Sequence, residues 1–138
     1  MVKYELIEHT ADIGIRVRGK DLKDLFKNAA LAMFDIILEK QELPVSKKTK
    51  TTIEQKAEGL EELFINWLNE LLSLSSAKEL IFTDFEISRL DKNNLSAVAI
   101  GGNIKDYKVG KEVKAATYHQ LKIEESKTGW LAEIIFDV

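Results

Sequence analysis

Two aspartates near opposite ends of the chain, Asp12 and Asp137, occupy positions that favour metal or acid–base chemistry. Asp12 directly precedes residues 13–18, where apolar side chains take every second place, and this alternation predicts a half-buried strand. Asp137 ends a second alternating stretch and is followed by Val138, the last residue of the sequence. A carboxylate at the mouth of a strand is held firmly and still reaches water, which suits a functional site. The alternative interpretation of Asp12 is that its side chain only caps a turn.

The three carboxylates would form one cluster if the last strand paired with residues 13–18. Asp12, Asp137 and the terminal carboxylate of Val138 would then converge, and such groups repel one another strongly unless a cation lies among them. Because all the ligands would be oxygens, the sequence predicts Ca²⁺ or Mg²⁺ rather than zinc. The two histidines, His9 and His119, are interpreted as hydrogen-bonding residues rather than ligands.

The composition is that of an ordinary globular protein, with 45% hydrophobic and 31% charged residues among 138. We therefore expect one domain over residues 1–138. Twenty basic and 23 acidic residues give a net charge of −3, which argues against a global field for binding nucleic acid. The absence of cysteine excludes disulfides, thiolate nucleophiles and cysteine-ligated zinc. The N-terminal sequence is not a signal peptide and no apolar run reaches membrane-spanning length, so we expect a cytoplasmic protein.

The apolar periodicity predicts an α+β fold with two amphipathic helices packed on a mostly antiparallel sheet. One helix begins after the N-cap Asp21 and ends near Leu38, and the second runs from about Leu60 to Leu74. Strands are predicted at 3–7, 13–18, 49–55, 81–90, 95–100, 113–123 and 130–138, the third of them exposed or at a sheet edge. Gly14 indicates a bulge or a close backbone approach. The glycines at 101 and 102 are interpreted as breaking a strand, so that residues 101–112 form a loop.

Four blocks of sequence, in this order, resemble the archease family. They are His9–Gly14 (HTADIG), Leu63–Leu72 (LFINWLNELL), Val113–His119 (VKAATYH) and Ile135–Val138 (IFDV), and together they span nearly the whole chain. The resemblance implies a strand–helix–strand–strand core of the SHS2 type with an inserted segment. It also implies a divalent-metal site at Asp12, Asp137 and Val138, which agrees with the cluster inferred from the residues.

The resemblance implies a function as well. Archeases are non-enzymatic activators of the GTP-dependent RNA ligase that joins 2′,3′-cyclic-phosphate or 3′-phosphate ends to 5′-hydroxyl ends in tRNA splicing and RNA repair. They promote guanylylation of the ligase and its multiple turnover, so the implied partner is that ligase and RNA is met only through it. A monomer is the default expectation. Residues 101–112 depart from the family's more acidic, histidine-containing loop, which leaves a partner contact there open.

Two other classes of function stay open. A metal-dependent hydrolase would use Asp12 or Asp137 as general base and a histidine as acid, although the sequence offers no nucleophile or substrate cradle. A small RNA-binding module would use basic side chains against phosphates, and the net charge argues against high affinity. Its candidate residues are Lys47, Lys48, Lys50, Lys108, Lys111 and Lys114.

Overall fold

A computed structural model of the chain describes residues 3–7, 12–40 and 47–138. The elements follow in the order β1 (Tyr4–Ile7), β2 (Ile13–Gly19), α1 (Leu22–Ile37), β3 (Leu38–Lys40), β4 (Thr49–Lys56), α2 (Leu60–Lys78), β5 (Leu80–Leu90), β6 (Asn94–Asn103), the 3-10 helix η1 (Ile104–Asp106), β7 (Lys108–Val109), β8 (Ala115–Ser126) and β9 (Gly129–Asp137). Every strand pair is antiparallel. The predicted α+β class is therefore confirmed.

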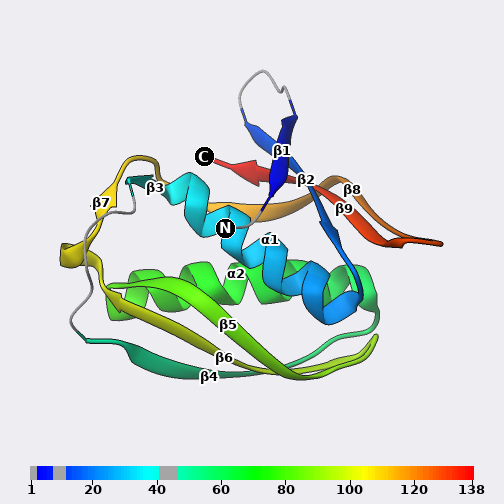
Figure 1. Cartoon of the computed structure of the whole chain (residues 1–138), viewed down its shortest axis with the longest axis horizontal. Coiled ribbons are helices and arrows are strands. Elements are labelled where there is room, and N and C mark those ends of the chain that lie inside the picture. Colours follow the sequence, from blue (N-terminus) through cyan, green and yellow to red (C-terminus); the bar gives the residue numbers. More distant parts are fainter. Residues whose placement is uncertain (1–2, 8–11, 41–46) are drawn as a thin grey trace.

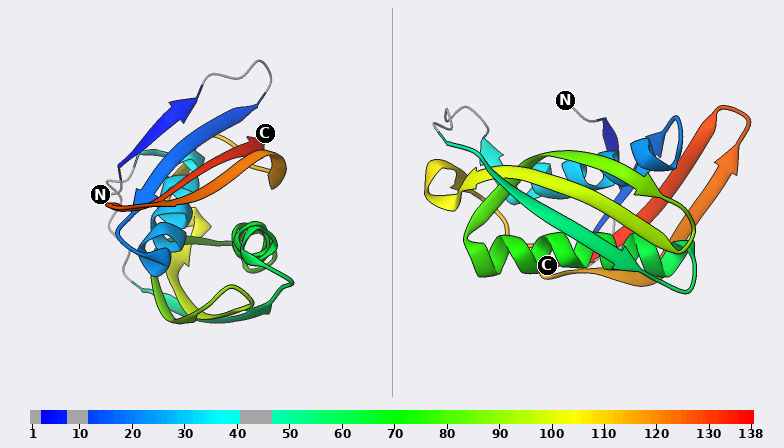
Figure 2. Two further views of the ribbon diagram at one scale, coloured as in Figure 1. Left: turned by 90° about the vertical axis from the view of Figure 1, so that its right-hand side faces the viewer. Right: turned by 90° about the horizontal axis from the view of Figure 1, so that it is seen from below.

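The two helices lie between two sheets (Figure 1). A four-stranded sheet has the order β1-β2-β9-β8, a three-stranded sheet has the order β4-β6-β5, and β3 pairs with β7 in a separate ribbon. Figure 2 shows α2 end-on beside α1, with one sheet on each side of the pair. α1 packs against β2 and β5, and α2 packs against β5 and β8. The prediction of helices on one sheet is thus refined, because the strands divide into sheets that cover both sides of the helices.

The strand–helix–strand–strand core consists of β2, α1, β8 and β9. β2 pairs with β9 from Ile13 opposite Phe136 to Gly19 opposite Trp130, so the last strand does pair with the strand after Asp12. All elements from β3 to β7 are inserted between α1 and β8. No helix within the described ranges has the length and apolar character needed to cross a membrane.

The prediction of a loop at 101–112 is wrong. β6 continues through the two glycines to Asn103, and it is followed by η1 and β7. Gly101 is needed inside the strand because a Cβ there would lie 2.0 Å from the Ile81 carbonyl oxygen. This close approach falls where the β5–β6 register shifts, between Phe82 and Asp84. The glycine therefore allows two backbones to approach within a strand, and it does not end one.

The helices begin largely as predicted, but the end of the second differs. Asp21 caps α1, and its Oδ1 accepts a hydrogen bond from the Asp24 backbone N–H at 2.8 Å. α2 runs one turn beyond the predicted Leu74, to Lys78, and its C-cap Glu79 has φ 55° in the left-handed region. The buried Ser75 hydroxyl donates to the Leu80 carbonyl, which ties the last turn of α2 to the start of β5.

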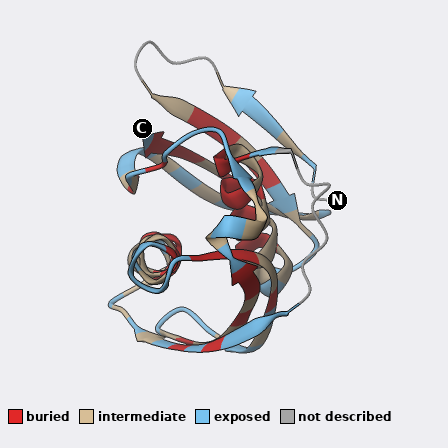
Figure 3. Ribbon diagram, turned by 90° about the vertical axis from the view of Figure 1, so that its left-hand side faces the viewer, coloured by how far each residue is buried: buried red, intermediate tan, exposed pale blue. Residues whose placement is uncertain are grey.

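The core fills the space between the two sheets (Figure 3). Trp67 from α2 is fully buried, and its indole N–H donates to the Phe26 carbonyl of α1 at 2.9 Å. The Phe26 and Phe64 rings meet edge to face with centroids 5.0 Å apart. The two helices are thereby fixed to each other as well as to the sheets.

Candidate metal site

The register of β2 and β9 brings the two predicted aspartates to one end of the four-stranded sheet. The last registered pair is Ile13 with Phe136, so Asp12 directly precedes β2 and Asp137 ends β9 at the same end of the sheet. Residues opposite each other in antiparallel strands point to the same face of the sheet. Ile13 and Phe136 point to the helices, since Phe136 is fully buried. Asp137 follows Phe136 and therefore lies on the other face, where it is exposed, and the alternation along β2 predicts the same face for Asp12.

Contacts from β8 and from the residue before it hold the end of β9. The Lys114 N–H donates to the Asp137 carbonyl at 2.8 Å, and Ala115 of β8 lies opposite Asp137 in the register. Val138 packs partly against the core. The position of the chain after Phe136 is thus set by β8 and by the core.

Asn69 of α2 supports this end of the sheet, and the sequence analysis did not assign it a role. Its Nδ2 donates to the Ala116 carbonyl at 3.1 Å, and its Oδ1 accepts from the Ala116 N–H at 2.7 Å. The side-chain amide thus occupies both hydrogen-bonding groups of one residue on the outer edge of β8. The available signal was an asparagine inside the largely apolar block LFINWLNELL, which also contains Asn66 and Glu70.

Gly14 lies beside the aspartate pair and confirms one of the two alternatives predicted for it. A Cβ at this position would lie 3.2 Å from the Ile7 Cβ and 3.7 Å from Ile135 Cγ1. Neither register that includes β2 shifts here, so the glycine marks a close approach and not a bulge. Its small size lets Ile7 and Ile135 close over β2 next to the carboxylates.

The donor set suits a hard cation better than zinc. The ligands supplied by Asp12 and Asp137 are carboxylate oxygens, and Ca²⁺ or Mg²⁺ completes such a shell with carbonyls and water. Within residues 3–7, 12–40 and 47–138 no three or more His, Cys, Asp or Glu side chains are grouped to hold a metal. The carboxylate of Val138 stays the predicted third ligand. His9 lies outside the described residues, and His119 lies in an exposed part of β8.

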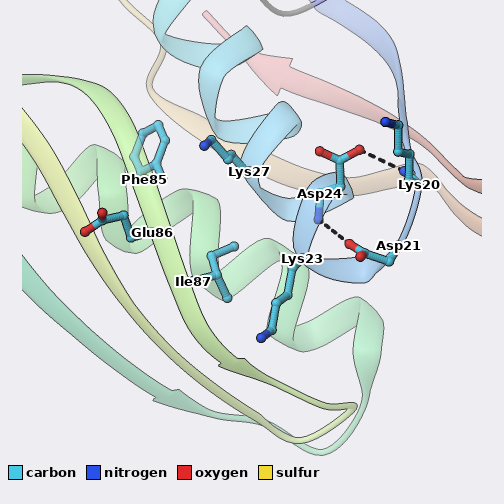
Figure 4. Close-up of a pocket in the computed structure, with 8 residues that line it drawn as sticks. All are labelled: Lys20, Asp21, Lys23, Asp24, Lys27, Phe85, Glu86 and Ile87. Carbon is cyan, nitrogen blue, oxygen red and sulfur yellow. Dashed lines mark hydrogen bonds between the residues drawn. The ribbon is translucent and has the colours of Figure 1, made fainter.

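Apart from the aspartate site, a hollow of about 400 Å³ lies between the start of α1 and β5 and is lined by three lysines (Figure 4). Lys27 pairs with Asp84 at 3.3 Å, and Lys23 Nζ donates to the Ser88 carbonyl at 3.3 Å. The lining also includes Asp21, Asp24 and Glu86, which offset the positive charge of the lysines. The hollow therefore lacks the net charge of an anion site.

Comparison with known proteins identifies the relatives of the chain. A profile of the Archease protein family matches residues 4–138. Protein archease of Methanosarcina barkeri is 36% identical over 142 residues, which cover 99% of this chain and 96% of that protein. Protein archease of Pyrococcus abyssi is 39% identical over 145 residues, with complete coverage of both chains.

Two solved structures share the fold. The solution structure of Methanobacterium thermoautotrophicum protein 1598 has a TM-score of 0.75 at 28% identity, covering 98% of each chain. The crystal structure of an archease from Thermotoga maritima, described as a possible chaperone, has a TM-score of 0.63 at 26% identity, covering 96% of this chain and 94% of that one. The chain belongs to the archease family.

Proposed function

We propose that this protein is a non-enzymatic, metal-binding activator of the GTP-dependent RNA ligase that joins 2′,3′-cyclic-phosphate or 3′-phosphate ends to 5′-hydroxyl ends. Membership of the archease family supports the assignment. The description of the Thermotoga protein as a possible chaperone is consistent with a protein partner. The observation that carries the proposal is the register of β2 with β9, which ends with Ile13 opposite Phe136 and so brings Asp12 and Asp137 to the same end of the sheet.

In this proposal Asp12, Asp137 and the carboxylate of Val138 hold Ca²⁺ or Mg²⁺. The cation supplies positive charge near the phosphates handled by the ligase during guanylylation. The chain's own part is to present rigid oxygen ligands at an open sheet end, while Lys114 lies beside them as a further polar contact. The protein acts in the cytoplasm, as a monomer, and meets RNA only through the ligase.

The proposal is tested by measuring guanylylation of the matched ligase with and without this chain. We expect the wild-type protein to raise the rate and restore multiple turnover. Asp12→Asn and Asp137→Asn should each reduce the stimulation about tenfold or more, because each removes a negative ligand while keeping the side-chain shape. Asp84→Asn is the matched control, since Asp84 lies in β5 of the other sheet and outside the proposed site. An equal rate with and without the protein would contradict the proposal.

Metal binding by the isolated chain is a separate test. Calorimetry with Ca²⁺ and with Mg²⁺ should show weaker binding after residues are appended to Val138, because the terminal carboxylate becomes a neutral amide. The same residues added before Met1 should leave the affinity unchanged. Equal affinity of the two extended forms would remove Val138 from the ligand set.

The hydrolase alternative is tested with the chain alone. RNA carrying a 2′,3′-cyclic phosphate or a 3′-phosphate should remain unchanged on incubation with the protein and Mg²⁺. Turnover that disappears in Asp12→Asn would favour an enzyme over an activator.

A further inference from the structure

An exposed aromatic ring stands on the outer edge of the four-stranded sheet. β8 is the last strand in the order β1-β2-β9-β8, so one of its edges has no neighbouring strand. Tyr118 in this strand is 55% exposed, whereas Leu121 three residues later packs against the core. A large, exposed tyrosine on a sheet edge is the kind of residue that dominates binding at protein interfaces.

A large β-bulge presents this ring. Between the pair Thr117–Ile135 and the pair Lys122–Glu133, β8 has four residues where β9 has one. Gln120 within the bulge has φ 53°, in the left-handed region that non-glycine residues seldom adopt. Such conformations are unfavourable and concentrate at functional sites. β-Bulges are also frequent next to functional sites, where they change the direction of a side chain.

The charge next to the ring is negative. Glu62 lies two turns before Asn69 on the same face of α2, and Asn69 bonds to Ala116 of β8, so Glu62 lies on the face of α2 that packs against β8. Its carboxylate also raises the pKa of the Tyr118 hydroxyl, although burial contributes more to that rise. The Glu62 carboxylate is fixed in place, because its Oε1 accepts a hydrogen bond from the Glu58 N–H at 3.1 Å. Within the described parts of the chain Glu62 forms no ion pair, and residues 115–121 contain no lysine or arginine.

We propose that Tyr118 and Glu62 form a docking site for an arginine side chain of the partner ligase. A guanidinium group can stack on an aromatic face and donate to a carboxylate at the same time. Lysine satisfies this geometry less well, because its ammonium group is a compact charge without a planar fork. RNA is disfavoured, since its phosphates would meet Glu62. The inference rests on the proposed function and assigns to the bulge a contact separate from the aspartate pair.

Equilibrium binding of this chain to the ligase tests the site. Tyr118→Ala should weaken the affinity about tenfold, because the ring is lost. Tyr118→Phe should stay within about twofold of the wild type, since it keeps the ring and removes only the hydroxyl. Glu62→Gln should weaken binding about fivefold; it removes the charge but keeps an oxygen that can accept from the Glu58 N–H.

The outcomes separate this inference from the proposed function. If the wild-type protein binds and activates the ligase and Tyr118→Ala binds with the same affinity, the docking site is overturned and the activator function still holds. Equal losses in Tyr118→Phe and Tyr118→Ala would overturn the stacking contact. No binding or activation by the wild-type protein would overturn both proposals. Tm measurements on each variant confirm that the fold is intact, which the exposure of Tyr118 leads us to expect.

Discussion

The two faces of the four-stranded sheet use side chains for different purposes. On the face toward α1, the central positions of β2 and β9 carry apolar side chains that are almost completely buried, namely Ile15, Val17, Ala132, Ile134 and Phe136. The opposite face presents an exposed network in which Arg16 pairs with Glu133 and with Glu5. β2 and β9 contribute to both faces, because side chains alternate along each strand.

This difference indicates that stability and function depend on different faces of the sheet. Burial of apolar area is the main contribution to folding, so the inner face should determine the free energy of unfolding. Exposed ion pairs contribute little to stability. The aspartates at the end of the outer face can therefore change without unfolding the chain, which a functional site requires.

Phe136→Ala should lower the free energy of unfolding by about 3–5 kcal/mol, because it opens a cavity at a fully buried position. Denaturation in urea measures the loss. Leu131→Ala on the other face of β9 is the control, since Leu131 is only half-buried. Equal losses in the two variants would erase the distinction between the faces.

Asn69→Ala should lower the free energy of unfolding by about 1–3 kcal/mol, because it leaves the N–H and the carbonyl of Ala116 without their partner. Asn66→Ala is the matched control, because its side chain makes no hydrogen bond with the described part of the chain. Thermal unfolding of both variants tests the prediction. A loss as large in Asn66→Ala would show that the effect comes from helix propensity and not from the edge of β8.

Tyr4→Phe should make stability less dependent on pH between 10 and 12. The Tyr4 hydroxyl donates to Asp35 Oδ2 at 2.6 Å, and burial together with this bond raises the pKa of Tyr4 to about 12. Because the pKa is higher in the folded state, its contribution is complete below pH 10 and is lost as the pH rises through about 12. The free energies of unfolding of the wild type and of Tyr4→Phe, measured from pH 9 to 12, should converge as the pH rises. A constant difference across that range would contradict the assignment.

Much of the fold could be predicted from local pattern. The Asp21 cap and the Asp91–Asn94 turn are short-range signals, and both occur in the structure, where Asp91 Oδ1 accepts from the Asn93 and Asn94 N–H groups. The ribbon of β3 and β7 could not be predicted, because three and two residues are too short to show a period. The loop predicted at Gly101 was wrong, because sequence alone does not distinguish a glycine that ends a strand from one that allows a neighbouring backbone to approach closely.

The candidate site was predictable only in part. The alternation after Asp12 and before Asp137 locates both at strand ends, but their pairing depends on which strands are neighbours. That is a long-range property, which periodicity does not encode. The bulge that presents Tyr118 was not predicted, because its residues read as a continuation of the strand from 113 to 123. Binding of metal by the predicted ligands stays a prediction.

Glu133→Gln should have the smallest effect, a decrease in Tm of about 2 °C or less. The Arg16 Nε lies 2.6 Å from Glu133 Oε2, but the two side chains are 34% and 23% exposed, so water screens the pair. Arg16 also keeps a second carboxylate, that of Glu5, at 3.4 Å. The remaining difference from the wild type should disappear in 1 M salt, where the Debye length is about 3 Å. Thermal unfolding at low and high salt measures both quantities. A decrease that approaches the one caused by Phe136→Ala, or one that persists in 1 M salt, would mean that the outer network carries stability like the core. The outer face would then be unable to change freely around its aspartates.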